Sequence, residues 1–355
     1  MSKVVTRAQF VNSVETFKQA YESTHFGRSS TKIPFSQETN HEIFEKLDLK
    51  NQYKDPSEKL HIVDYNTGFN SFVYDLNHYL HPRFHLLIPN SAAMHRFWKR
   101  LHDNDPLCRN FFLFQEDPRS LRHYNSEELI NSGKIVLDRN PAEKVNQTLL
   151  ITGSYITTSD KSKVRSMLYF NQMRLAWYKY PKVKSLFWLR PADALKYLGI
   201  MGSRFRQTNS VVATAFGEVN VIAYSNFEKQ KSVTRCMRQY PNAIELPKMP
   251  QHEDLMLVEF QSNQDKYKIE HMPEFTLVLH KLFMLPSYKV VQNLHFLGPG
   301  ADEYFKQVLP ASVLECRICD LPIEELVEIS NLYFRWPFKP MTDLELYLES
   351  DKDHT

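Results

Sequence analysis

The chain has 355 residues, which is enough for one large domain and a smaller one. Its 42% hydrophobic and 24% charged residues are ordinary for a globular protein, and its formal net charge is only +3. It contains 9 glycines, where average usage would give about 25, so it cannot hold many phosphate-binding loops and a nucleotide-hydrolysing enzyme is disfavoured. No apolar run approaches the roughly 20 residues that span a bilayer, and we expect no membrane segment.

The four cysteines do not make a disulfide framework in a chain of this length. Cys316 and Cys319 form a single Cys-x-x-Cys, but no second pair follows, and the nearest histidines upstream lack zinc-finger spacing. We therefore expect no metal site and interpret the cysteines as reduced, partly buried thiols.

The first 38 residues form an irregular or partly helical lead-in, in which Lys3 and Arg7 precede the first acid, Glu15. This pattern is a weak mitochondrial-type leader at best, and an ordinary amphipathic helix explains it equally well. Thr39 and Glu42 then form a capping box in front of a helix.

Short apolar runs after this helix predict buried strands. They lie at residues 60–63, 83–88, 111–114, 148–151, 183–189 and 255–260, with a further pair of strands at 211–215 and 219–224. Helical patterns separate most of these runs, and a long one covers 163–178. This alternation predicts a doubly wound parallel sheet whose final, closely spaced strands are antiparallel.

Only helical patterns occur from about residue 263 onward. We therefore predict an α/β Rossmann-like domain at 39–262, a smaller all-helical domain at 263–340 and an acidic tail at 341–355. The last helix ends at Trp336-Pro337-Phe338-Lys339-Pro340, because two prolines forbid its continuation. Trp336 and Phe338 either form a docking surface or pack on the helical domain.

The stretch from Leu60 to Leu80 organises the first domain. An apolar strand ends in Asp64, a turn follows, and apolar residues then recur at helical spacing. Strand, acid, tight turn and helix are the opening elements of a Rossmann-type sheet that binds a nucleoside-containing cofactor.

This stretch resembles the first motif of S-adenosylmethionine-dependent methyltransferases, in the form found in the KsgA-type ribosomal RNA adenine dimethyltransferases. Asp64 matches the motif's acid and Gly68 matches one of its glycines, whereas Asn66 and Asn70 stand at the other two glycine positions. Asn adopts left-handed backbone angles more readily than other non-glycine residues, so the turn can persist. The asparagine side chains occupy space that the cofactor needs, and we expect a retained scaffold without a cofactor.

The same resemblance assigns roles to the residues that follow later strands. Pro89 stands where the family carries the acid that binds the ribose, and Asp117 matches the Asp that pairs with adenine. Thr152 stands at the Asn of the family's Asn-Leu-Pro-aromatic motif, and Tyr155 keeps its aromatic residue, which stacks on the flipped base. We expect Gly68, Pro89, Asp117 and Thr152 to mark a vestigial cofactor site and expect no catalytic residue.

A narrower resemblance covers residues 30–342. The segments at 43–49, 60–80, 116–118, 298–305 and 333–340 are similar to the fungal mitochondrial transcription factor B family, the specificity factors of mitochondrial RNA polymerase. The resemblance implies a mitochondrial, monomeric initiation factor of the matrix nucleoid, which binds a single-subunit RNA polymerase, helps to melt promoter DNA and holds the opened strand. An active rRNA adenine dimethyltransferase is the alternative, and an RNA-binding relative without a polymerase partner is a third.

Charge is unevenly distributed along the chain. Eleven basic residues and a single acid, Asp193, lie between Lys161 and Arg206. Such a segment can neutralise phosphates, and interleaved aromatic residues can stack on unpaired bases; an acidic partner surface is the alternative target. The expected nucleic-acid contacts are Lys161, Lys163, Arg165, Lys179, Lys182, Lys184 and Tyr155, supported by the aromatic residues Tyr169, Phe170, Trp177, Tyr178 and Tyr180. Half of these aromatic side chains are equally explained as core residues of a buried helix.

Overall fold

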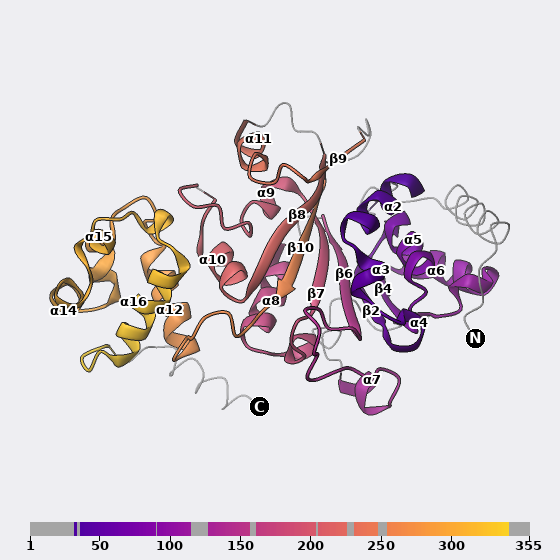
Figure 1. Cartoon of the computed structure of the whole chain (residues 1–355), viewed down its shortest axis with the longest axis horizontal. Helices are drawn as coiled ribbons and strands as arrows, with labels where there is room; N and C mark the ends of the chain where they lie inside the picture. The colour runs from indigo at the N-terminus through magenta and orange to yellow at the C-terminus, as the bar shows by residue number, and fades with distance from the viewer. Residues whose placement is uncertain are drawn as a thin grey trace. The chain divides into compact units, whose positions relative to one another are not determined.

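A computed structural model describes residues 32–33, 36–89, 91–114, 127–156, 161–203, 205–225, 231–247 and 254–340 (Figure 1). The chain divides into two compact units, one formed by Met1–Ala194 and Glu218–Asn263 and the other by Leu195–Gly217 and Gln264–Thr355. The predicted boundary at residue 262 lies next to the third crossing between the units, at residues 263–264. Residues 195–217, which we expected in the Rossmann-like domain, group with the helical unit.

The first unit contains an eight-stranded sheet with the order β5-β4-β2-β6-β7-β10-β8-β9. Its strands are β2 (His61–Thr67), β4 (Phe84–Pro89), β5 (Phe111–Leu113), β6 (Leu149–Tyr155), β7 (Lys184–Leu189), β8 (Gly217–Ser225), β9 (Ile244–Leu246) and β10 (Met256–Ser262). The strands from β5 to β7 pair in parallel, and β10 runs antiparallel to β7. The predicted Rossmann-like sheet is therefore confirmed. The prediction that its final strands are antiparallel holds for β10 against β7, whereas β8 and β9 pair in parallel.

The strand order reverses beside β2, the central and completely buried strand. The chain passes from β2 outward through β4 to β5 and then returns to the other side of β2 as β6. In open α/β sheets, ligands bind at the carboxyl ends of the strands that flank this topological switch point. The ends of β2 and β6 are therefore the place to look for a cofactor site.

Short and long helices connect the strands of this unit. They are α2 (Gln37–Lys46), α3 (Leu49–Gln52), α4 (Pro56–Lys59), α5 (Ser71–Leu80), α6 (Ala92–Asn104), η1 (Pro106–Cys108), α7 (Glu127–Asn131), α8 (Lys161–Gln172), η4 (Ala176–Lys179), α9 (Pro191–Ala194) and α11 (Lys231–Met237). Two short strands, β1 (Lys32–Ile33) and β3 (Phe69–Asn70), pair in parallel.

Helices α2 and α5 cover one face of the sheet. Phe44 and Phe72 share a core with Ile62, Leu150 and Leu186 of the central strands. The apolar residues that recur at helical spacing in the Leu60–Leu80 stretch provide this packing surface. Helix α5 is buried along its whole length. Burying such side chains contributes about 1.5–3 kcal/mol each, so the organising stretch anchors the unit.

The second unit is helical in its described part, as predicted. It contains α10 (Thr208–Ala215), α12 (Met272–Leu282), α13 (Val290–Asn293), η5 (Leu294–Leu297), α14 (Ala301–Val308), α15 (Ala311–Leu314), η6 (Ile318–Asp320) and α16 (Ile323–Arg335). Helix α16 ends before the two prolines, and Trp336 is buried and stacks on Tyr304 with ring centroids 5.7 Å apart. Phe338 remains 79% exposed, so the two aromatic residues divide between packing and surface.

Three local predictions were wrong. Residues 211–215 form helix α10 instead of a strand, because Ser210 bonds the backbone of Gln207 at the helix start and Val211 packs into the helical core. The long helix predicted at 163–178 ends at Gln172. Arg174, which has a left-handed backbone angle, lies between α8 and η4, and Ala176, the first residue of η4, is also left-handed. The first helix is capped by Ser36, which accepts from the Thr39 amide, and not by Thr39 itself.

No helix in the described ranges is long and apolar enough to span a membrane.

The sheet contains a buried ion pair between a lysine and a glutamate. Lys184 on β7 donates to Glu259 on β10, and the two side chains are 5% and 11% exposed. The pair lies diagonally across the antiparallel ladder in which Lys184 faces Gln261. A buried charge without its partner is strongly destabilising.

Lys184→Ala is therefore expected to lower the free energy of unfolding by about 3–5 kcal/mol, because Glu259 stays buried without its cation. Lys179→Ala, on an exposed residue nearby, should change it by only about 0.5 kcal/mol or less. Urea denaturation of the two variants and the parent protein measures both effects. Equal midpoints for the two variants would contradict the structural role of Lys184.

Candidate functional site

The carboxylate of Asp64 is fully buried in the middle of β2, where Asp64 pairs in register with Thr152 of β6. It accepts hydrogen bonds from the Thr67 hydroxyl and, at 2.5 Å, from the Thr152 hydroxyl on β6. Burial raises the pKa of Asp64 from 3.8 to about 7, although the two threonine hydrogen bonds act in the opposite direction. Asp64 and Thr152 are thus hydrogen-bonded to each other, and this bond joins β2 and β6, the two strands at the switch point.

The two asparagines at glycine positions also bind within the protein. Asn66 has a left-handed φ of 53°, as the turn requires, and its amide nitrogen donates to the Ser154 carbonyl at 3.4 Å. Asn70 instead has an extended φ of −134°, caps α5 by accepting from the Phe72 amide, and donates to the Ser154 hydroxyl at 3.0 Å. The turn that would approach a cofactor is therefore tied to β6 by side chains that glycines lack.

A lysine of the basic segment reaches the same turn. Lys163 on α8 donates its ammonium to the Asn66 side-chain oxygen at 2.8 Å. We expected Lys163 to contact nucleic acid, but the structure places its head group on the turn after β2. Lys163 and the two asparagines fill this end of the sheet with a hydrogen-bonded polar network.

The other positions that we expected to mark a vestigial cofactor site, as far as they are described, are engaged in packing or hydrogen bonds. Pro89 is the buried last residue of β4 and lies opposite Thr67, while the Gly68 carbonyl accepts from the Trp98 indole at 3.0 Å. Gly153, between Thr152 and Ser154, has no room for a larger side chain, because a Cβ there would lie 2.8 Å from the Tyr155 ring. Asp117 falls outside the described residues.

Tyr155 does not match its expected role as a stacking platform. The side chain is 2% exposed and meets the Phe187 ring edge to face, with centroids 5.2 Å apart. The strand β6 continues through this residue, whereas the sequence indicated a loop after residue 151. The alternation of the longer strand turns Tyr155 into the interior, and its assignment as a nucleic-acid contact was wrong.

The basic segment offers less surface charge than its sequence indicates. Lys184 is buried in the ion pair with Glu259, and its predicted role in DNA contact was wrong for that reason. Lys182 is partly buried and donates to the carbonyls of Pro141 and Glu143. Among the bases of this segment whose side chains are described, which excludes Arg204, the exposed ones are Arg165, Arg174 and Lys179. The side chain of Lys161, although on α8, falls outside the described residues.

The aromatic residues of the segment divide in the same way. Trp177, Tyr178 and Tyr180 are buried, and the Trp177 indole donates to the Tyr65 hydroxyl at 2.6 Å. Tyr169 is 49% exposed and Met173 is 37% exposed. Because Arg165, Tyr169 and Met173 follow one another at intervals of four residues, they share one face of α8 up to its end. This face combines a cation with a stacking-competent ring.

A second basic surface escaped the sequence analysis. Arg96, Lys99 and Arg100 are exposed on α6, whose apolar side chains at Met94, Phe97, Trp98 and Leu101 are buried. The signal was present in the sequence, because these bases recur at helical spacing between the apolar positions. Counting charges along the chain favoured the longer segment at 161–206 instead.

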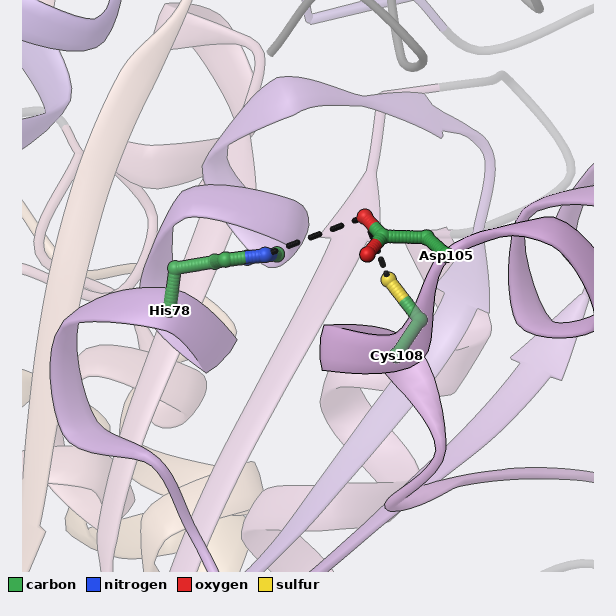
Figure 2. A group of neighbouring side chains, drawn as sticks. All are labelled: His78, Asp105 and Cys108. Carbon is green, nitrogen blue, oxygen red and sulfur yellow. Dashed lines mark hydrogen bonds and ion pairs between the residues drawn. The ribbon is translucent and has the colours of Figure 1, made fainter. Parts of the chain in front are cut away.

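A buried group of potential metal ligands was also missed. His78 on α5, Asp105 and Cys108 direct their side chains toward one another, and their ligand atoms all lie within 4.8 Å of one another (Figure 2). Burial lowers the pKa of His78 and raises that of Cys108. Among the described residues this is the group whose donors could hold a metal ion.

The fold and the position of the site define a Rossmann-like methyltransferase architecture. Residues 28–333 match the family described as Ribosomal RNA adenine dimethylase, so the chain belongs to that family. The solved structure of the 23S rRNA methyltransferase ErmE has the same fold, with a TM-score of 0.50, 13% identity, and coverage of 85% of this chain and 99% of that chain.

The chain is also similar to two yeast proteins named Mitochondrial transcription factor 1. The Saccharomyces paradoxus protein is 26% identical over 307 residues, covering 84% of this chain and 86% of the relative. The Saccharomyces cerevisiae protein is 25% identical over the same length and coverage. The expected resemblance to mitochondrial transcription factors within the dimethyltransferase family is confirmed.

Asp64 gives the site a testable pH dependence. Its folded-state pKa of about 7 exceeds the ordinary 3.8, so the folded protein holds this proton more tightly than the unfolded chain. The contribution of protonated Asp64 to the free energy of unfolding is therefore fully present below about pH 4 and is lost as the pH rises toward 7. Asp64→Asn should gain stability relative to the parent protein over this range, by roughly 4 kcal/mol in unfolding free energy.

Denaturation profiles between pH 4 and 8 measure this difference. Asp75, whose pKa burial also raises to about 7, is present in both proteins and cancels in the comparison. Asp254→Asn, on an exposed residue, serves as the control and should follow the parent profile. Parallel profiles for Asp64→Asn and the parent protein would show that Asp64 does not titrate as described.

Proposed function

We propose that this protein is a mitochondrial transcription initiation factor that enables a single-subunit mitochondrial RNA polymerase to recognise and melt its promoters and that binds the opened DNA. One observation carries the proposal. In a chain related to proteins named Mitochondrial transcription factor 1, the switch point where a methyltransferase binds its cofactor is occupied by Asn66, Asn70, Lys163 and the Asp64–Thr152 pair.

The protein acts in this proposal by binding and has no turnover of its own. Thr152 lacks the amide that the dimethyltransferase motif uses to accept from the target amino group, and its hydroxyl donates to Asp64. Pro89 cannot bind ribose hydroxyls as a carboxylate does. These features disfavour the alternative, an active rRNA adenine dimethyltransferase, which the family membership alone would suggest.

Helix α8 is the surface that we assign to opened DNA. Arg165 supplies a phosphate contact, Tyr169 supplies a ring for a base to stack on, and Lys179 on η4 extends the charge. Phosphate contacts are independent of sequence and weaken as salt rises, and stacking favours unpaired over paired bases. A partner that exposes single-stranded DNA fits this combination better than duplex DNA does.

The remaining features of the proposal concern partners and location. The polymerase supplies catalysis, and this chain acts on it as a monomer in the mitochondrial matrix nucleoid. Arg96, Lys99 and Arg100 on α6 give a second cationic surface for DNA or for acidic residues of the polymerase. No membrane attachment is part of the proposal.

We expect neither S-adenosylmethionine binding nor methyl transfer. Each lost hydrogen bond to a charged group weakens binding by about 1.5–3 kcal/mol, and the side chains described above occupy the turn. Calorimetric titration should show no micromolar binding, and labelled cofactor should transfer no methyl group to small-subunit rRNA. Transfer above that of a heat-denatured sample would favour the dimethyltransferase alternative.

Run-off transcription with the cognate polymerase tests the proposed function directly. The protein should be required on a linear promoter, and a template whose start region is already unpaired should relieve most of that requirement. Equal dependence on the two templates would exclude a role in melting, and no dependence on either would exclude an initiation factor.

The variant Arg165→Ala/Tyr169→Ala/Lys179→Ala tests the α8 surface in the same assay and in binding to a bubble template. Loss of two phosphate contacts should reduce the salt slope by about 1.4–1.8, and loss of stacking should cost about 1–3 kcal/mol for the bubble. Fluorescence anisotropy at several salt concentrations measures both effects.

The chain offers a matched control for this variant. Lys268→Ala/Lys281→Ala/Tyr288→Ala in the helical unit removes the same charge and an aromatic residue of equal exposure, since Tyr288 is 48% exposed. It should bind the bubble as the parent protein does. If the α8 variant binds the bubble normally but fails to join the polymerase, the surface contacts the polymerase instead. Equal salt slopes and affinities for the two variants would remove α8 from the proposal altogether.

A further inference from the structure

Three buried side chains with nitrogen, oxygen and sulfur donors converge outside the switch point (Figure 2). His78 belongs to α5, Asp105 follows the end of α6, and Cys108 ends η1. The His78 Nε2 lies 4.0 Å from Asp105 Oδ2, and the Cys108 Sγ lies 3.5 Å from the same oxygen. The three residues are 6%, 4% and 0% exposed.

Hydrogen bonds around the cluster orient these donors. The His78 Nδ1 lies 2.8 Å from the Tyr74 carbonyl, so this nitrogen carries the proton and Nε2 directs its lone pair toward Asp105. The Tyr74 hydroxyl donates to Asp105 Oδ2 at 2.8 Å. A histidine ligand held by a backbone carbonyl, and a carboxylate ligand held by a second donor, are typical of the outer shell of a metal site.

We propose that His78, Asp105 and Cys108 bind a structural zinc ion. Electrostatics supports the assignment, because Zn²⁺ together with one carboxylate, one thiolate and a neutral imidazole has no net charge, which suits a fully buried position. The mixed donor set also suits zinc, a borderline-soft ion that accepts Cys, His and Asp ligands. Coordination removes the proton from a thiol.

The observed separations are close to those of a zinc tetrahedron. Zinc bonds of about 2.0–2.3 Å place neighbouring ligand atoms roughly 3.3–3.8 Å apart. In the cluster, Asp105 Oδ2 lies 3.5 Å from Cys108 Sγ and 4.0 Å from His78 Nε2, and the ligand atoms all lie within 4.8 Å of one another. Side-chain movements of a fraction of an ångström would therefore close the site. The second Asp105 oxygen or one water supplies the fourth ligand.

The position of the cluster indicates a structural role for the metal. The ion would join α5, the helix that follows the Asn66–Asn70 turn, to the connection between α6 and β5. The surrounding core contains Val73, Tyr74, Phe97, Trp98 and Cys108, so no substrate reaches the ion through these side chains. This inference does not depend on the proposed role in transcription.

Metal analysis of the full-length, untagged protein tests the inference. Protein purified without chelators should contain nearly stoichiometric zinc, and removal of the metal should lower its melting temperature in a manner that added zinc reverses. Metal-free protein loaded with Co²⁺ should show a thiolate-to-cobalt charge-transfer band in the near ultraviolet. Protein that contains no zinc, and that gives no such band after Co²⁺ is added, would overturn the site.

Two cysteine variants distinguish this site from general thiol binding. Cys108→Ser should lose the cobalt band and most of the zinc, whereas Cys236→Ser, a change at another buried cysteine of the same unit, should keep both. His78→Gln gives a second ligand variant if Cys108→Ser does not fold. Retention of the full band by the folded ligand variants would also overturn the proposal.

Discussion

The site depends on the hydrogen bonds that the buried carboxylate of Asp64 accepts. It lies in the middle of strand β2, opposite Thr152 of β6, and accepts hydrogen bonds from the hydroxyls of Thr67 and Thr152. A buried polar group that loses such partners costs about 1–3 kcal/mol, so the strands β2 and β6 are held together at the switch point. The adjoining Asn66 and Asn70 contacts to Ser154 extend the same seam into the first turn of α5.

The sequence predicts the parts of this fold that depend on local pattern. The Leu60–Leu80 stretch shows a strand and an amphipathic helix, and the structure contains both at that place. The turn predicted after Asp64 was wrong, because β2 continues to Thr67 with a register shift between Tyr65 and Thr67. The strand predicted at residues 211–215 was wrong because the sequence Val-Val-Ala-Thr-Ala is compatible with either a strand or a helix. The hydrogen bond between Ser210 and the Gln207 backbone and the packing of Val211 favour the helix. Packing partners of this kind lie far away in the sequence, as Phe275 does, and a local pattern does not identify them.

The candidate site shows the same division. Asp64, Gly68 and Thr152 could be placed at the switch point because they follow strands that the sequence identifies. Lys184 could not be excluded from the surface, since its partner Glu259 is 75 positions later and meets it only through the β7–β10 register. The burial of Tyr155 depends on how far β6 continues. The burial of Lys184 and that of Tyr155 therefore both depend on contacts between distant parts of the chain, which cannot be inferred from composition.

The proposed loss of the cofactor site and the proposed nucleic-acid surface on α8 are physically compatible in this fold. Close approach of a cofactor to the backbone favours glycine, and two asparagines, Asn66 and Asn70, stand at the expected glycine positions. The α8 surface uses Arg165 and Tyr169, which lie on the solvent side of a helix whose buried side contains Val164 and Met167. The expected cofactor region and the proposed α8 surface therefore consist of different residues. Lys163, near the start of α8, connects the two regions through its contact with Asn66. Under the proposed function, the scaffold binds nucleic acid through α8 beside the place where a methyltransferase of this fold holds its cofactor, because the fold by itself does not determine the activity.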